Sequence, residues 1–197
     1  MSVVIGIKKD GVVYLGADSQ STRGGSKIIL TNPNNFKVWK VSGVDNCLIG
    51  HVGDFKDACA VRVIENLVRE IDVFHECVDY RYVVTRIVPF IIDQLKSYNY
   101  LERDGKFKGM DSSFLFAFKD KLFYIGYMGE VVEVDDFITI GSGEDEAYGS
   151  LLSTLDEEDQ NKRIIQAINA STKRDIRVAY PIVLANTFDT TYQIIKE

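Results

Sequence analysis

The 197-residue chain has few of the residues on which several common kinds of site depend. Its three cysteines, Cys47, Cys59 and Cys77, lie too far apart for the Cys-x-x-Cys pairs of a zinc site, and each lies in or beside an apolar run, which predicts buried thiols. No apolar run approaches the roughly 20 residues of a membrane span. The first residues lack the basic start and long apolar stretch of a signal peptide. We therefore expect a cytoplasmic protein that needs no membrane, metal or cofactor.

The chain also lacks an excess of positive charge. Lys and Arg number 23 against 29 Asp and Glu, which gives a net charge of −6 at pH 7. Proteins that bind the phosphate backbone of nucleic acids usually carry clustered basic residues, and the sequence contains no such cluster. Nucleic acid is therefore not an expected partner.

Histidine is scarce as well, with only His51 and His75. This is poor support for a Ser-His-Asp triad, and Gly-x-Ser-x-Gly is absent. The Gly141-Ser142-Gly143 run is not followed by the lysine of a phosphate-binding loop. We expect His75 in a solvated loop, and His51, within an apolar strand, either in the core or lining a pocket.

The predicted secondary structure is grouped along the chain, strands with strands and helices with helices. Strands are predicted over residues 2–7, 12–17, 36–41, 47–52, 113–118, 122–127, 131–134, 137–140, 176–187 and 191–195. The polar segment 19–35 is predicted to be a loop. Helices are predicted from Ala60 to Ile71 and from Val84 to Tyr98, with a kink or shifted boundary at Pro89, and over 145–155 and 157–173. Strands grouped with strands predict an α+β fold in one domain, 1–197, with two stacked antiparallel sheets each covered by a helix pair.

Because neither histidine is a convincing general base, a nucleophile in this chain would need a different proton acceptor. An N-terminal Ser or Thr can use its own α-amine as the base, since that amine titrates near pH ~7.7–8. Ser2 follows Met1 and is small enough for the methionine to be removed. Because Met-Ser is a common start, this signal alone is weak.

The neighbouring residues strengthen it. The run from Gly11 to Ser21, GVVYLGADSQS, resembles the second strand of β-type proteasome subunits, and Asp18 lies 16 residues after Ser2, the family's spacing between nucleophile and acidic partner. Similar to family motifs, in the same order, are Phe36-Lys37-Val38, the segment 51–58, Gly141-Ser142-Gly143 with Tyr148-Gly149, and Lys173-Arg174-Asp175. The resemblance covers nearly the whole chain and includes the related ATP-dependent ring peptidase of bacteria.

The resemblance implies a fold and a set of roles. The fold would be the four-layer α-β-β-α sandwich of N-terminal nucleophile hydrolases. Ser2 would be the nucleophile after Met1 removal, with Lys37 beside it and Asp18 holding that lysine. The Gly53 N–H would face the developing oxyanion. Ser142 and Asp175 would surround the α-amine. Each residue also has an ordinary interpretation: a strand-end turn for Asp18, a solvated charge for Lys37, a helix cap for Ser142 and a helix-end charge for Asp175. The sequence departs from the family in having Ser for the usual Thr, and Val178 where many members have Ser.

The resemblance further implies a peptidase that cleaves peptides or unfolded proteins inside a homo-oligomeric ring, with an ATPase unfoldase as a possible partner. Two alternatives remain open: an unprocessed, inactive ring subunit that keeps Met1, and a small-amide hydrolase of the same fold. By position, His51 would form the floor of the first substrate pocket and Phe55 a wall, unless His51 is an inert core residue. An unperturbed histidine, with a pKa of about 6.5, would favour acidic groups near pH 6.

Overall fold

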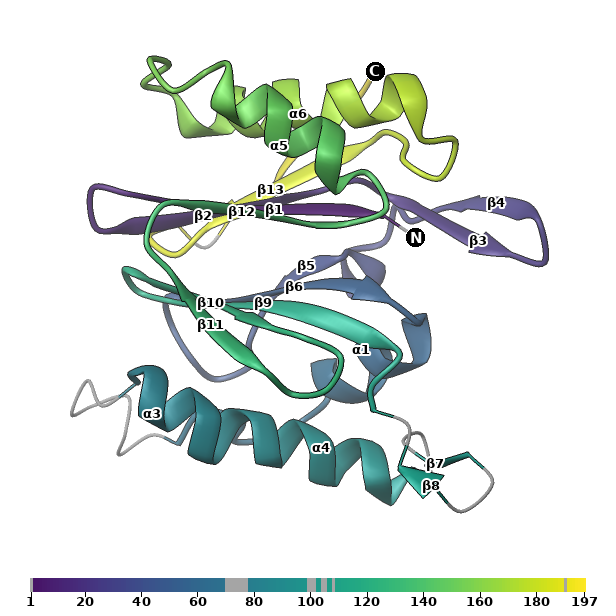
Figure 1. The fold of residues 1–197 in the computed structure, drawn as a ribbon, viewed down its shortest axis with the longest axis vertical. Coiled ribbons are helices and arrows are strands. Elements are labelled where there is room, and N and C mark those ends of the chain that lie inside the picture. Colours follow the sequence, from purple (N-terminus) through teal and green to yellow (C-terminus); the bar gives the residue numbers. More distant parts are fainter. Residues whose placement is uncertain (1, 70–77, 99–101, 104–105, 108, 190) are drawn as a thin grey trace.

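The computed structural model describes residues 2–69, 78–98, 102–103, 106–107, 109–189 and 191–197. These residues form two five-stranded antiparallel sheets stacked face to face (Figure 1). The sequence-based expectations for Met1, His75, Cys77 and the end of the helix expected up to Ile71 lie outside the described residues.

The first sheet contains both ends of the chain. Its strand order is β12 (Phe137–Gly141), β1 (Val3–Lys9), β2 (Val12–Ala17), β13 (Ile182–Asn186) and β14 (Gln193–Ile195). The second sheet runs β11 (Val131–Val134), β10 (Lys121–Ile125), β9 (Ser112–Phe118), β6 (Cys47–Gly53) and β5 (Val38–Lys40).

Helices cover the outer face of each sheet, which completes four layers (Figure 1). Helices α5 (Glu144–Leu152) and α6 (Gln160–Arg174) lie on the first sheet. The second sheet is covered by α1 (Phe55–Arg62), α3 (Tyr80–Tyr82), a π-helical turn (Val83–Ile87) and α4 (Val88–Ser97). The predicted α-β-β-α sandwich is therefore confirmed.

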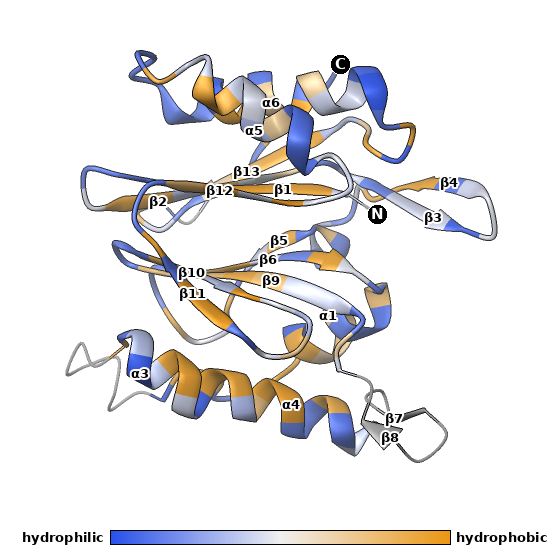
Figure 2. Ribbon diagram, in the orientation of Figure 1, coloured by the Kyte–Doolittle hydropathy of each residue, from blue (hydrophilic) through white to orange (hydrophobic). Residues whose placement is uncertain are grey.

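The alternation of side chains along the strands explains the layering. Val3, Ile5 and Ile7 of β1 pack against α5 and α6, whereas Val4 points to the second sheet. On the second sheet, Phe116 belongs to the cluster under the helices and Leu115 to the cluster between the sheets. Figure 2 shows apolar residues concentrated on the sheets and on the inward faces of the helices. Each sheet thus buries both faces.

Two short ribbons complete the described chain. The first, β3 (Gln20–Arg23) with β4 (Ser26–Ile29), extends away from the sandwich (Figure 1), and the second pairs β7 (Glu102–Arg103) with β8 (Lys106–Phe107). The prediction of a loop over 19–35 was therefore wrong, since the segment also contains a 3₁₀ turn (Pro33–Asn35). Beyond Gln20 the ribbon is mostly exposed, so its strands lack the apolar alternation that marks a strand with one buried face.

The first helix pair also differs from the prediction. Helix α1 ends at Arg62, and Asn66 has a positive φ of 55°, which breaks the helix expected over 60–71. The apolar Ile64, Leu67 and Val68 are nevertheless buried in the expected core. Pro89 lies in the first turn of α4, after the π-helical turn in which the Val88 N–H bonds to the Val83 carbonyl. The shifted boundary expected at Pro89 is therefore found.

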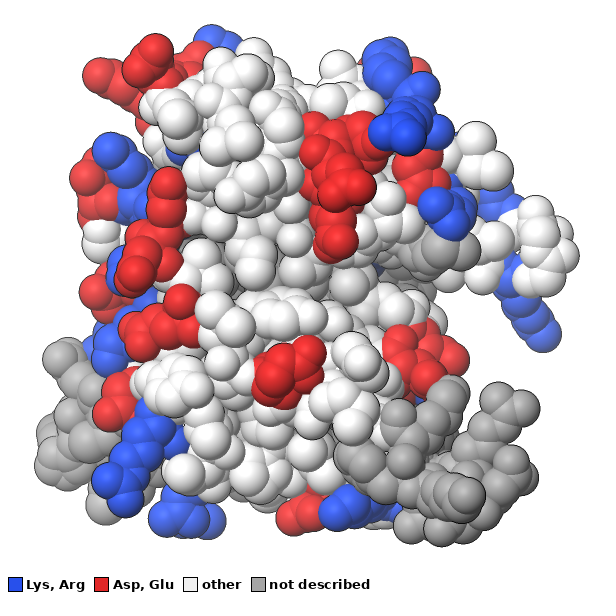
Figure 3. All heavy atoms as spheres, viewed as in Figure 1, with Lys and Arg blue, Asp and Glu red and all other residues white. Residues whose placement is uncertain are grey.

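Among the described residues, no helix is both long and apolar enough to cross a membrane. In Figure 3, acidic and basic side chains alternate along the left edge of the face shown, and the middle is mostly uncharged with a few separate acidic groups.

Candidate active site

The site begins with Ser2, which is held where β1 starts. Ser2 is 4% exposed, and its carbonyl accepts hydrogen bonds from the Gly143 N–H (3.3 Å) and the Ser142 hydroxyl (3.4 Å). Gly141, at the end of β12, has a φ of 109°, and a Cβ there would lie 2.2 Å from the Ser2 carbonyl oxygen. Only glycine fits this close approach, so the Gly141-Ser142-Gly143 turn packs directly against the backbone of Ser2 and hydrogen-bonds to it.

Asp18 follows β2 and accepts four hydrogen bonds. Its Oδ1 accepts from the Val3 N–H (3.0 Å) and from Lys37 Nζ (2.7 Å). Its Oδ2 accepts from the backbone N–H groups of Gln20 (2.9 Å) and Ala179 (3.3 Å). Asp18 is 1% exposed. Its carboxylate connects the first strand, the start of β3 and the segment after α6 by hydrogen bonds.

Lys37 is the cation of this site. It is 5% exposed, and its backbone carbonyl accepts from the His51 N–H at 2.9 Å, which fixes it beside β6. Burial lowers the pKa of Lys37, while the charges of Asp18 and Asp175 and the hydrogen bond to Asp18 raise it. The interpretation of Lys37 as a solvated strand charge is therefore wrong.

Gly53 ends β6 and precedes the Asp54 cap of α1. Its φ is 121°, and a Cβ there would lie 2.3 Å from the Asp111 carbonyl oxygen, so the position requires glycine. The Gly53 backbone is open to solvent at the rim of the site, because the residue is exposed.

A pocket of about 300 Å³ joins these residues. It is lined by Ser2, Gln20, Ser21, Thr22, Lys37, His51, Gly53, Asp54 and Phe55. Five of the eight predicted site residues therefore face one pocket, and Asp18 lies directly behind Lys37. Sequence reasoning missed the contribution of Gln20, Ser21 and Thr22; their position just after Asp18 was the available signal.

Ser142 and Asp175 lie behind Ser2 and line a separate hollow of about 490 Å³. Burial raises the pKa of Asp175, but hydrogen bonds from Arg177 and Ser142 outweigh it and lower that pKa to about 2. The Arg177 Nε lies 2.7 Å from Asp175 Oδ1. Val178 is buried against the position of Gly143, and the Ser171 hydroxyl donates to the Gly143 carbonyl at 2.7 Å. Ser171, which sequence reasoning did not single out, thus supports the turn that holds Ser2.

His51 is 3% exposed, and its ring packs near Phe114 and Trp39. Its Nε2 lies 3.1 Å from the Asp54 carbonyl oxygen, which can only accept, so we assign the ring proton to Nε2. Burial, reinforced by the charge of Lys37, lowers the pKa of His51 to about 3. A buried imidazole beside a lysine stays neutral near pH 6, so the preference for acidic groups that a protonated histidine would give is not expected here.

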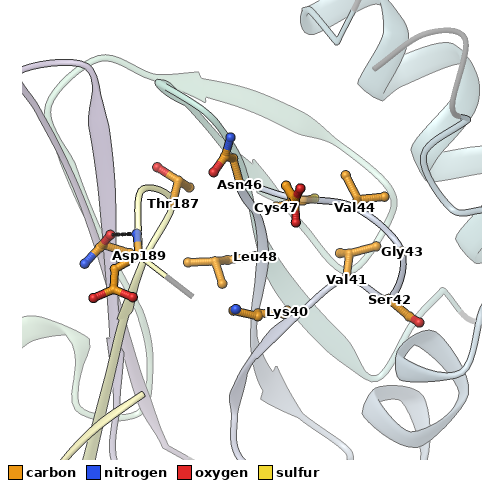
Figure 4. Close-up of a pocket in the computed structure, with 12 residues that line it drawn as sticks. Lys40, Val41, Ser42, Gly43, Val44, Asn46, Cys47, Leu48, Thr187 and Asp189 are labelled. Atoms are coloured by element: carbon orange, nitrogen blue, oxygen red, sulfur yellow. Dashed lines mark hydrogen bonds between the residues drawn. The ribbon is translucent and has the colours of Figure 1, made fainter. Parts of the chain in front are cut away.

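A second pocket of about 290 Å³ lies at the turn between β5 and β6 (Figure 4). It is lined by residues 40–48 with Asn186, Thr187 and Asp189. The Thr187 hydroxyl accepts from the Val13 N–H and donates to the Lys119 carbonyl, and burial raises the pKa of the Cys47 thiol. Neither side chain is therefore an activated nucleophile.

Comparisons with known proteins identify the family and the fold. A family model described as "Proteasome subunit" matches residues 2–185. The structure is similar to BPH of Thiobacillus denitrificans in complex with Epoxomicin, at 16% identity and a TM-score of 0.68, covering 99% of this chain and 100% of that one. It is also similar to HslV of Trypanosoma brucei (19% identity, TM-score 0.65, covering 93% and 98%) and to Anbu of Yersinia bercovieri (10%, 0.73, covering 99% and 87%). At these identities the structural matches show a shared fold. No curated protein sequence matched the chain.

Proposed function

Since the chain belongs to the proteasome subunit family, we propose that it is a peptidase whose nucleophile is Ser2, exposed at the N-terminus when Met1 is removed. The observation that carries this proposal is the 300 Å³ pocket in which Ser2, Lys37 and Gly53 meet, with Asp18 bonded to the lysine from behind. We treat residues 1–197 as one domain.

The proposed chemistry uses the Ser2 hydroxyl, the Ser2 α-amine that Met1 removal would free, and the side chains and backbone of the pocket. The Ser2 hydroxyl attacks the substrate carbonyl and passes its proton to the Ser2 α-amine, which then protonates the leaving amine. Lys37 stabilises the negative charge that develops on the serine oxygen and favours the neutral form of the amine. Asp18 keeps Lys37 in position. The Gly53 N–H faces the oxyanion, where one donor typically contributes roughly 3 kcal/mol. Water then hydrolyses the acyl-enzyme by the same proton transfers in reverse.

Ser142 and Asp175 are proposed to orient the α-amine. The Ser142 hydroxyl already contacts the Ser2 carbonyl, and Asp175 acts on Lys37 through its charge. Because the pKa of Asp175 is about 2, its carboxylate stays ionised at any pH at which the amine is a base. Val178 offers no hydroxyl at the place where many family members have Ser.

His51 and Phe55 are proposed to contact the substrate side chain next to the cleaved bond. Both line the pocket with Ser2, and Phe55 begins α1 immediately after Asp54. A neutral imidazole beside an aromatic ring suits medium-sized or polar side chains better than long aliphatic ones.

Assembly into a homo-oligomeric ring in the cytoplasm, working on unfolded protein with an ATPase unfoldase as a possible partner, is part of the proposal. Its support is the family and a set of large apolar side chains that one chain leaves exposed: Tyr148, Leu152, Leu155, Ile176 and Phe188, among others. Light scattering is expected to report an assembly many times the 22.2 kDa of one chain. A stable monomer at micromolar concentration would contradict it.

The decisive experiment tests the hydroxyl and the amine together. A peptide epoxyketone offers a carbonyl to the hydroxyl and an epoxide carbon to the amine, and closes a ring without losing an atom. Intact mass spectrometry should show wild type without Met1 and heavier by the full reagent mass. Ser2→Thr should still react, Ser2→Ala should not, and the exposed Ser153→Ala serves as the matched control.

The alternatives predict a different mass or a different substrate profile. An unprocessed, inactive ring subunit would keep Met1 and gain no reagent, and the loss of a hydroxyl at Val178 is the feature that favours this reading. A small-amide hydrolase would lose Met1 but cleave no member of a fluorogenic peptide panel.

A further inference from the structure

The residue packed beneath Gly53 is Ser112, the first residue of β9. The two residues are register partners across the β6–β9 pair, and Ser112 is 3% exposed. A Cβ on Gly53 would lie 2.5 Å from Ser112 Cα and 2.8 Å from its Oγ.

The Ser112 hydroxyl lies between two groups that border the pocket. Its Oγ donates to the Asp54 carbonyl at 3.2 Å and lies 3.1 Å from His51 Nε2. The same Asp54 carbonyl accepts from His51 Nε2 at 3.1 Å. Two side chains therefore hold the carbonyl of the residue that follows the oxyanion glycine.

The N–H of Asp54 is bonded to Asp111, the residue directly before Ser112. The Asp54 N–H donates to the Asp111 carbonyl at 3.0 Å, and the Asp111 N–H donates to Asp57 Oδ2 at 3.1 Å. Asp57 is 0% exposed, on the first turn of α1. The backbone of Asp54 is thus bonded through both its N–H and its carbonyl.

These bonds matter because a glycine cannot fix its own backbone conformation. Gly53, with a φ of 121°, has no side chain that restricts the rotation of its own peptide groups. A donor stabilises an oxyanion only if it already points at the position where the charge develops. The Gly53 N–H belongs to the peptide group that Gly53 shares with Val52, so its direction depends on the backbone on both sides of Gly53. The Ser112 hydroxyl contacts a residue on each side of this glycine, His51 before it and Asp54 after it.

We propose that Ser112 is a positioning residue, whose hydroxyl holds Asp54 and His51 so that the Gly53 N–H points at the oxyanion. The inference rests on the proposed peptidase function. Ser112 does not line the pocket, so the proposed role involves no contact with the substrate. It acts on the transition state through Gly53, and its loss should lower kcat rather than weaken substrate binding.

Ser112→Ala tests this, with Ser113→Ala as the matched control. Successive strand side chains point to opposite faces, and Ser113 Oγ lies 3.5 Å from the Tyr124 hydroxyl, away from the Ser112 bonds. With a fluorogenic peptide, we expect kcat to fall roughly 10- to 100-fold in Ser112→Ala, which is part of the 10²–10³ typical of losing one oxyanion donor. KM should stay within about twofold, and Ser113→Ala should match wild type in both constants.

A pair of inhibitors separates positioning from a general structural role. A peptide aldehyde gains a bond from the Ser2 oxygen to its carbonyl carbon, and its oxygen then occupies the oxyanion position. The matching peptide alcohol binds without such a bond. In Ser112→Ala the affinity for the aldehyde should fall by the same factor as kcat, whereas the affinity for the alcohol should stay unchanged. Ser112→Thr, which keeps the hydroxyl, should recover kcat.

The outcomes separate the two proposals. A wild-type protein that neither cleaves peptides nor reacts with the epoxyketone would overturn the proposed function and this inference with it. An active wild type with an unchanged Ser112→Ala, or with equal losses for aldehyde and alcohol, overturns the inference alone. If Ser112→Ala fails to assemble, Ser112→Cys fills the same space with a weaker donor and is held to the same criteria.

Discussion

Replacing Asp18 by Asn removes one charge from a buried site while keeping the shape of the side chain. In the wild type each carboxylate oxygen accepts two hydrogen bonds, Oδ1 from Val3 and Lys37 and Oδ2 from Gln20 and Ala179. An asparagine has one oxygen and one NH₂ group. Whichever way the amide turns, two donors face another donor, and Lys37 loses its ion-pair partner.

The expected cost follows from this geometry. Removing one partner of a buried ion pair typically destabilises a protein by about 3–5 kcal/mol, because the remaining charge stays buried. At about 2–4 °C per kcal/mol for a domain of this size, the melting temperature should fall by roughly 6–20 °C. Peptidase activity should disappear as well, since Lys37 loses both its position and its charge.

The loss should depend on pH in a defined direction. Burial already lowers the pKa of Lys37, and loss of Asp18 lowers it further. Between that folded-state pKa and the ordinary lysine value of about 10.4, the unfolded chain binds more protons, so the free energy of unfolding rises with pH. The stability deficit of Asp18→Asn relative to wild type should therefore shrink between pH 7 and pH 10.

Urea unfolding followed by Trp39 fluorescence measures this deficit, since Trp39 is the single tryptophan of the chain and is 2% exposed. Asp159→Asn is the matched control, because Asp159 caps α6 by accepting from the Lys162 N–H and Asn caps helices equally well. A deficit below about 1 kcal/mol at pH 7, or one that is the same at pH 10, would refute the reasoning about the buried pair.

Three further predictions concern the surroundings of the pocket. Gly141→Ala places a Cβ 2.2 Å from the Ser2 carbonyl and should reduce kcat/KM to background, whereas Gly149→Ala meets no atom within 4 Å and should leave it unchanged; equal activities would contradict the contact. Because the pKa of His51 is about 3, the preference for the residue before the cleaved bond, measured on a peptide panel, should be constant from about pH 5 to about pH 8. The same preference should change in His51→Ala. The ionised Asp175 contributes stability that is present above its ordinary pKa of about 3.9 and lost as pH falls through its folded value of about 2. In Arg177→Ala, unfolding measured across this window should depend less on pH, and an unchanged dependence would remove Arg177 as the cause.

Much of the architecture could be predicted because strand patterns are local. The alternation along β1 and β2 and the Asp10-Gly11 turn, with φ values of 49° and 78°, depend on neighbours within a few residues. The β3–β4 ribbon was not predicted, because its exposed strands lack the alternation of apolar and polar residues by which a strand is recognised. The end of α1 was missed because Ile64 and Leu67 stay buried without being helical, and periodicity reports burial rather than backbone shape.

The site divides in the same way. Ser2, Asp18 and Lys37 could be proposed from a family pattern, and the structure brings them together. The Asp18 bond to the Ala179 N–H spans 161 residues and leaves no trace in either segment. Ser112 likewise lies 61 residues from His51, and its hydroxyl resembles any other serine until the sheet is assembled. The neutrality of His51 could not be predicted, because it depends on how completely the ring is buried.

The four bonds to Asp18 also set the order in which activity can arise during synthesis. The donors come from the first strand, from the start of β3, from Lys37 after the β3–β4 ribbon, and from the residues after α6. A chain emerging from its N-terminus has Ser2 long before it has Ala179. Until that late segment folds onto the first sheet, Asp18 lacks its Ala179 donor and β2 lacks its neighbour β13. Under the proposed function, a partly made subunit is therefore inert, and hydrolysis reports that the whole chain has folded.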